Sequence, residues 1–236
     1  MSRGDSVPMV SQQLLLSVAE QLKLPLLQIA RQAELASLHA QPNLGLIQST
    51  ADTALRLIDG YVLGVRLNLE QSQLDVEPVS VSSILYDTGQ ELDAIAKAYG
   101  VSLELNIAGR YGPVMAHKQG LQTALVSLGV ALIEALPATE APQLKLQLAA
   151  YRCRYGIVAG LYSETEQLSL DALRQGRRLQ GKVRQPLAQH SHTSGAGIFV
   201  ADALLAAMDL KLQLTRHHGL FGLGTVLEPN NQLQLV

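Results

Sequence analysis

The stretch Glu20-Gln-Leu-Lys-Leu-Pro-Leu26 places a proline inside a strongly helical pattern. Apolar residues recur around it at steps of three and four, which puts them on one seam of a helix: Leu15, Val18, Leu22, Leu26, Ile29, Ala33 and Ala36. A proline in a helix interior removes one backbone hydrogen bond and kinks the helix. Pro25 therefore needs a specific reason to be there.

A second helix of the same kind follows after the polar break at residues 39–43. Its seam consists of Leu44, Ile47, Ala51, Ala54, Ile58, Tyr61, Val65 and Leu69. Two long helices joined by a short loop pack antiparallel, but alone they bury only part of their apolar surface. We therefore predict a homodimer in which two hairpins form a four-helix bundle, with an interface of Leu15, Val18, Leu22, Ile47, Ala51 and Ile58. The alternative is that the hairpin packs on the rest of its own chain.

The remainder of the chain alternates helical and strand patterns. We predict helices over 82–99, 117–136 and 195–210, and strands over 101–107, 113–116, 144–152, 155–162, 211–215 and 225–227, with a glycine-bearing turn at 219–224. Such an order gives one sheet with helices on one face. The predicted fold class is α+β: a helical-hairpin domain over 9–70, a linker over 71–79 and an α/β sandwich over 80–236.

Composition narrows the class of protein. Of 236 residues, 47% are hydrophobic and 16% are charged, which excludes disorder for most of the chain. A formal net charge of −2 argues against a nucleic-acid binder that relies on overall basicity. The single cysteine, Cys153, excludes an internal disulfide and a cysteine-ligated zinc site, and we expect it to be buried and inert. No apolar run approaches the ~18 residues of a membrane span and no signal peptide is evident, which predicts a cytoplasmic protein.

The segment order resembles the catalytic core of sensor histidine kinases, a phosphoacceptor hairpin followed by an ATP-binding domain of the Bergerat (GHKL) type. Residues 20–26 are similar to the family's His-Glu-Leu-Lys/Arg-Thr-Pro-Leu box, which accounts for Pro25. Residues 54–59 and 65–67 resemble the second hairpin helix, and 121–135 the helix that carries the asparagine box. Ser194-Gly-Ala-Gly-Ile198 resembles the second glycine box, and Gly222-Leu-Gly-Thr-Val226 resembles the glycine-threonine turn before the last strand.

The departures from this family concern its chemistry. The phosphoacceptor histidine falls on Glu20, and the following acid falls on Gln21. The metal-coordinating asparagine falls on Ala131, which offers Mg²⁺ no oxygen, and the upstream asparagine falls on Ser127. No acid occurs from 141 to 163, where the family has the aspartate that holds adenine. The resemblance therefore implies a degenerate kinase core without catalytic residues, metal or required cofactor.

Without catalytic residues, the resemblance implies a role in binding other proteins. We expect Glu20, Gln21, Lys23 and Leu24 to bind a receiver domain of a response regulator or another histidine kinase, because receivers dock on this bundle in the family. Ser194, Gly195 and Gly197 are a weak remnant of a nucleotide site, since a helix N-terminus can hold an anion. The basic run from Arg174 to Arg184, where the family has its ATP lid, is either a solvated loop or an anion site.

Two other functions remain open. The chain could be a divergent ATP-binding kinase or ATPase that uses Glu134, one turn beyond Ala131, as a substitute metal ligand. It could also be a histidine phosphotransferase of a phosphorelay, although His39 at the hairpin tip is the only histidine of the hairpin. The pair His217 and His218 precedes a turn and is expected to face solvent.

Overall fold

The structure is a computed structural model that describes residues 18, 22, 26–27, 29–31, 33–34, 44–70, 73–107, 109–135, 144–165, 170, 173–174, 176–177 and 195–230. All described positions between 18 and 34 are helical, and helix α2 spans Leu44–Glu70. Both observations agree with the helical periodicity of the first seventy residues. None of the helices in the described ranges has the length and apolar character that a bilayer crossing needs.

Five strands in the described part of the chain form the main sheet, in the order β2-β4-β5-β7-β6. These are β2 (Val101–Ile107), β4 (Leu144–Cys153), β5 (Gly156–Ser163), β6 (Gln213–His217) and β7 (Leu220–Leu227). Strand β2 runs parallel to β4, and the other neighbours are antiparallel. A smaller antiparallel pair joins β1 (Glu77–Val79) to β3 (Val114–Ala116). Residues 77–79, which we assigned to the linker, are thus part of a sheet; the division into two domains stays a prediction.

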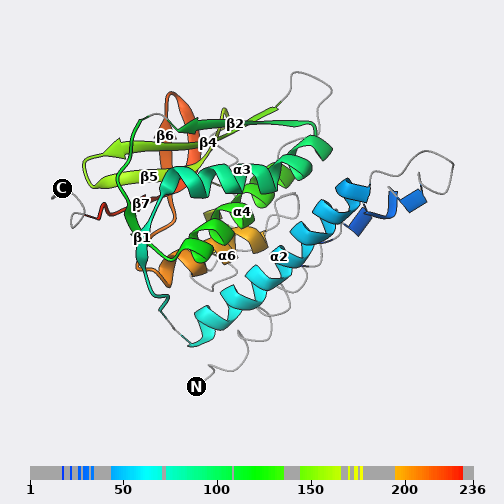
Figure 1. Cartoon of the computed structure of the whole chain (residues 1–236), viewed down its shortest axis with the longest axis horizontal. Helices are drawn as coiled ribbons and strands as arrows, with labels where there is room; N and C mark the ends of the chain where they lie inside the picture. The colour runs from blue at the N-terminus through cyan, green and yellow to red at the C-terminus, as the bar shows by residue number, and fades with distance from the viewer. Residues whose placement is uncertain are drawn as a thin grey trace.

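Three helices cover one face of the main sheet: α3 (Val81–Ala98), α4 (Lys118–Ala135) and α6 (Gly195–Ala206) (Figure 1). Helix α3 shows why the boundaries fall where they do. The hydroxyl of Ser80 accepts a hydrogen bond from the backbone N–H of Ser83 at 3.3 Å, which caps the N-terminus. Gly100, with φ of +69°, ends the helix in a left-handed conformation, as its position in the sequence predicts.

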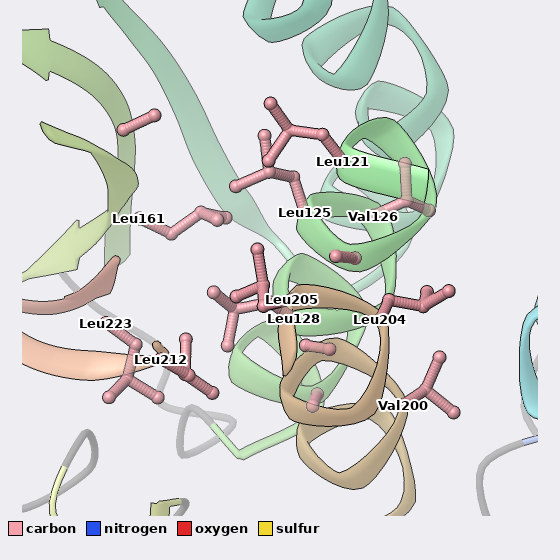
Figure 2. Packing of buried hydrophobic residues seen from close by; sticks show 14 of the residues in the cluster. Leu121, Leu125, Val126, Leu128, Leu161, Val200, Leu204, Leu205, Leu212 and Leu223 are labelled. Atoms are coloured by element: carbon pink, nitrogen blue, oxygen red, sulfur yellow. The ribbon is translucent and has the colours of Figure 1, made fainter. Parts of the chain in front are cut away.

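The main core lies between this helix layer and the sheet. Figure 2 shows Leu121 and Leu125 of α4 directed toward the sheet, where Leu161 and Leu223 lie. All four are at most 3% exposed. On the opposite side of the helix layer, Val200 points away from the sheet (Figure 2). Helices α4 and α6 therefore have two apolar sides and need a second covering element.

That element is α2, which lies outside the helix layer (Figure 1). A Cβ added at Gly60 would lie 3.0 Å from the Thr123 side chain, and one at Gly64 would lie 3.4 Å from the Val200 Cα. These two glycines, one turn apart, let the helix backbones approach closely. The inner face of α2 thus packs on its own chain, which is the alternative we set beside the dimer.

The outer face of α2 carries an exposed aliphatic stripe. Leu55 is 59% exposed, Ile58 40% and Val62 54%, at the helical spacing of three and four residues. The apolar seam that we predicted for the second helix contains residues of both the inner and the outer face of α2. Both faces are apolar, and periodicity alone does not separate them. A homodimer through this stripe stays a prediction.

The predicted glycine turn at 219–224 is wrong. The turn is His218–Gly219, and β7 already begins at Leu220. Gly222 and Gly224 lie inside β7. A Cβ added at Gly222 would collide with the Leu161 carbonyl oxygen, and one added at Gly224 would lie 2.7 Å from the Ala159 carbonyl oxygen. The glycines therefore serve close strand packing rather than a turn.

Candidate functional site

Helix α4 carries the two positions, 127 and 131, to which the resemblance assigns the family's asparagines. Ala131 is 0% exposed and Ser127 is 1% exposed. Gly60 of α2 approaches this face, since a Cβ there would lie 3.6 Å from the Ser127 hydroxyl oxygen. An apolar methyl group thus stands where the resemblance places a metal ligand, and α2 covers the neighbouring turn of the helix.

The stretch to which the resemblance assigns the aspartate box, 141–163, includes strand β5, which pairs with β7. Ala159 pairs with Thr225 in the strand register, and both face the helix layer together with the core leucines of these strands. The Thr225 hydroxyl is buried and has no hydrogen-bond partner among the described residues. A buried hydroxyl left unpaired costs about 1–3 kcal/mol. The position opposite Thr225 therefore supplies a methyl group where a polar partner would be favourable.

The glycine remnant lies at the first turn of α6. Gly195 and Gly197 are both buried, whereas Ser194 lies outside the described residues. Of the basic run, Arg174 is exposed, and the Arg177 guanidinium donates to the Leu212 carbonyl oxygen at 3.2 Å. Burial of both glycines is consistent with tight packing at this helix start and leaves a nucleotide role untested.

Several predicted sites fall outside the described residues. These are the partner-binding residues Glu20, Gln21, Lys23 and Leu24, the interface residue Leu15, and His39 at the hairpin tip. Of the other predicted interface residues, Val18 and Leu22 pack against the core of their own chain. Ile47 and Ala51 are partly exposed. Leu26 and Leu27, on the first helical segment, are 58% and 54% exposed.

A pocket of about 520 Å³ lies between α2, α3 and the first half of α4. Sequence reasoning did not find it, because its walls come from three separate segments. Its polar lining includes Asp59 of α2, Glu91 of α3, and Gln122 and Ser127 of α4. The Gln122 amide nitrogen donates to the Glu91 carboxylate at 2.5 Å, which ties α4 to α3 at the pocket wall.

His117, at the entrance to α4, also lines this pocket. Its Nδ1 accepts a hydrogen bond from the backbone N–H of Gly120 at 3.0 Å, so the imidazole caps the helix N-terminus. A neutral imidazole that accepts at Nδ1 carries its proton on Nε2. The pocket thus offers acceptors, amide donors and a fixed imidazole, a set suited to binding a polar group. Groups of three or more metal-ligating side chains are absent from the described part of the chain.

Glu134 lies in the last turn of α4, half-buried beside Tyr61 of α2 and Tyr99 after α3. Burial raises the pKa of the Glu134 carboxyl to about 8. Burial raises the pKa of both tyrosines as well, and the Glu134 charge adds to that effect. At neutral pH Glu134 is therefore largely protonated, and a protonated carboxyl is a poor ligand for a hard cation.

The face of the sheet opposite the helix layer carries a ring cluster that we did not predict. His217 is 7% exposed, and its ring stacks on Tyr151 with centres 4.5 Å apart. Tyr162 lies beside it, and its hydroxyl oxygen accepts from Thr215 at 3.1 Å. Burial lowers the pKa of His217, with the neighbouring His218 as a second cause. The expectation that both histidines face solvent is wrong for His217 and holds for His218.

Cys153, which we expected to be buried, is partly exposed at the end of β4. Its sulfur accepts from the backbone N–H of Tyr155 at 3.4 Å, within the β4–β5 turn. The residue ends its strand rather than lying within it, which explains the difference in burial.

Comparison with known proteins shows which solved structures are similar to this fold. No family model and no curated protein matches the chain. Among solved structures, Acinetobacter baumannii histidine kinase AdeS matches with a TM-score of 0.50 and 13% identity, over 89% of this chain and 97% of that one. Full-length ShkA in complex with AMPPNP matches with a TM-score of 0.53 and 15% identity, over 93% of this chain and 46% of that one. A bacterial phosphotransferase matches with a TM-score of 0.46 and 13% identity, over 93% of this chain and 97% of that one.

The chain therefore has the fold of a sensor histidine kinase core. This confirms the α+β fold class and the resemblance drawn from the order of segments. At 13–15% identity the match concerns the fold, and the residues at each position have to be judged by their own chemistry.

Proposed function

We propose that this chain is a catalytically degenerate, histidine-kinase-like protein of two-component signalling, which acts in the cytoplasm by binding other proteins. One observation carries the proposal: Ala131 is fully buried at the position of the family's metal ligand, while α2 packs on the same side of α4. Phosphoryl transfer depends on positioning and on charge neutralisation of the phosphates. The methyl group of Ala131 can neither position a phosphate nor help to neutralise its charge.

The surrounding positions support the same proposal. The sequence between 141 and 163 contains no acid, and Ala159 stands opposite the unpaired Thr225 hydroxyl. The matched ShkA structure holds AMPPNP, so a nucleotide is compatible with the fold in that protein. In this proposal the frame of the fold is kept and its polar ligands are replaced by small apolar residues. A divergent ATPase would need Glu134 as metal ligand, and the raised pKa of that carboxyl works against this role.

The proposed interaction partners are a second copy of the chain and a receiver domain or another histidine kinase. The outer face of α2 supports the homodimer, because Leu55, Ile58 and Val62 form an aliphatic stripe that gains from being covered. Leu26 and Leu27 on the first helical segment are exposed as well, and they follow closely in the sequence on the positions that we assign to a receiver or kinase.

Nucleotide binding and phosphorylation test the catalytic part of the proposal. The purified chain is heated with and without Mg²⁺ and ATP or AMPPNP, and is incubated with γ-labelled ATP. We expect no change in Tm and no label on the protein. Incubation with a phosphorylated receiver covers the phosphotransferase alternative, and we expect no label on His39. Stoichiometric labelling in either assay would refute the proposal.

Sedimentation tests the dimer separately. Ile58→Glu and Val62→Glu place a charge in the aliphatic stripe and are expected to yield monomers. Leu214→Glu is the matched control, since Leu214 is 45% exposed on β6. A wild-type chain that is monomeric at high concentration would exclude the dimer and leave the catalytic proposal standing.

A further inference from the structure

A second pocket, of about 410 Å³, lies where β4 turns into β5. Its walls are the turn residues 152–157, Gly112 with Pro113, and Pro229 with Asn230. It shares no lining residue with the pocket between α2, α3 and α4. Figure 1 shows the β4–β5 turn at the end of the sheet remote from α2. This pocket therefore contains neither Ser127 and Ala131 nor the glycines at 195 and 197.

Two arginines provide the charge of this pocket. One guanidinium nitrogen of Arg152 donates to the Arg110 carbonyl oxygen at 3.0 Å, which leaves most of its N–H groups available. The Arg154 guanidinium lies 5.9 Å from the centre of the Tyr155 ring. The pocket lining contains no Asp or Glu, and neither arginine forms an ion pair within the described residues.

Two lysines among the described residues are used differently. Lys97 pairs with Asp93 at 2.6 Å, and Lys145 pairs with Glu104 at 2.8 Å. In a chain with only 16% charged residues, two guanidinium groups without a carboxylate around one hollow create a local positive potential. The planar fork of arginine matches the oxygens of a carboxylate or a phosphate.

The remaining walls indicate what else a ligand would carry. Pro113, Ile157 and Pro229 contribute apolar surface, and the Tyr155 ring is 74% exposed beside them. The volume falls within the range of ~300–1,000 Å³ found for small-molecule sites. We propose that this pocket binds an oxyanion, a carboxylate or a phosphate, attached to a compact apolar or ring-shaped body, with Arg152 and Arg154 as the anion-binding residues.

Titration of the full chain with three probes tests the proposal. The probes are inorganic phosphate, phenyl phosphate and a phosphoserine pentapeptide, each followed by backbone amide shifts at constant ionic strength with NaCl as reference. We expect phenyl phosphate to shift the amides of residues 112 and 152–157, and to bind more tightly than inorganic phosphate. A peptide that binds more tightly than phenyl phosphate would assign the oxyanion to a protein partner; the reverse order would assign it to a small molecule.

Charge variants identify the residues. Arg154→Gln removes a guanidinium that makes no hydrogen bond in the described structure, so it leaves folding intact and should weaken binding at least about tenfold. Arg152→Gln should do the same, and Arg66→Gln on α2 is the matched control with an exposed arginine. The proposal is overturned if no probe shifts these amides, if NaCl causes the same shifts, or if Arg66→Gln weakens binding as much as Arg154→Gln.

Discussion

Replacing the buried acid of α4, by Glu134→Gln, should change how the stability of this protein depends on pH. Burial raises the pKa of Glu134 from its ordinary value of 4.5 to about 8 in the folded chain. The folded chain therefore binds more protons at this group than the unfolded chain does between these two pH values. Stability is then fully present below pH 4.5 and falls as the pH rises toward and through 8.

The size of the effect follows from the two pKa values. Between pH 5.5 and pH 8, linkage gives a loss of about 3 kcal/mol in the free energy of unfolding for a shift of this size. Water reaches part of the half-buried carboxyl, so about 3 kcal/mol is an upper figure. A glutamine side chain has nearly the same shape as the protonated acid and cannot ionise. The variant should match the wild type below pH 4.5 and become more stable than it above that pH, with up to about 3 kcal/mol of the difference arising between pH 5.5 and pH 8.

Urea unfolding followed by circular dichroism at pH 5.5, 7, 8 and 9 measures this difference. The quantity of interest is the free energy of unfolding of the variant minus that of the wild type, which cancels all other titrating groups. Glu228→Gln is the control, because it makes the same chemical change at an exposed side chain. Parallel curves for wild type and Glu134→Gln, or a variant that is less stable at pH 9, would refute the reasoning.

Three further changes test the packing. Gly129→Ala should destabilise the fold by about 1–3 kcal/mol in urea unfolding, because the added Cβ collides with the Leu92 side chain; an unchanged midpoint would mean that α3 and α4 are farther apart than described. Thr225→Val should keep or raise the free energy of unfolding, since it removes a buried hydroxyl without a partner. A decrease of more than about 1 kcal/mol in that free energy would reveal a hydrogen bond to the hydroxyl. Gly64→Leu should separate α2 from Val200 and speed proteolytic cleavage within α2, whereas an unchanged cleavage rate would contradict the close approach of α2 and α6.

Local sequence signals predicted the elements of the α/β part well. The alternating pattern after Gly100 predicted β2 at its observed bounds, Val101–Ile107. The apolar pattern of 117–136 predicted α4 to within a residue at each end. These signals succeed because they are short-range: side-chain periodicity and capping depend on neighbours along the chain.

The candidate sites were predictable only where they follow from aligned positions. Ala131 could be placed on α4 from the order of leucines, and the structure buries it there; the loss of a metal site stays a prediction. His217 could not be placed correctly, because its burial depends on Tyr151, which lies on β4 and is separated from β6 by two other strands of the sheet. Arg152 and Arg154 are unremarkable in the sequence, since the pocket they border is closed by residues near 112 and 229.

The sequence by itself determined the kind of fold. Periodicity specified the helices and strands, and the residue types at 20, 131 and 141–163 support the proposal that kinase chemistry is lost. Only the tertiary structure decided which apolar face of α2 is buried. Both faces are hydrophobic, and the choice depends on Gly60 and Gly64 meeting α4 and α6, a match of shapes between segments about 60 to 140 residues apart.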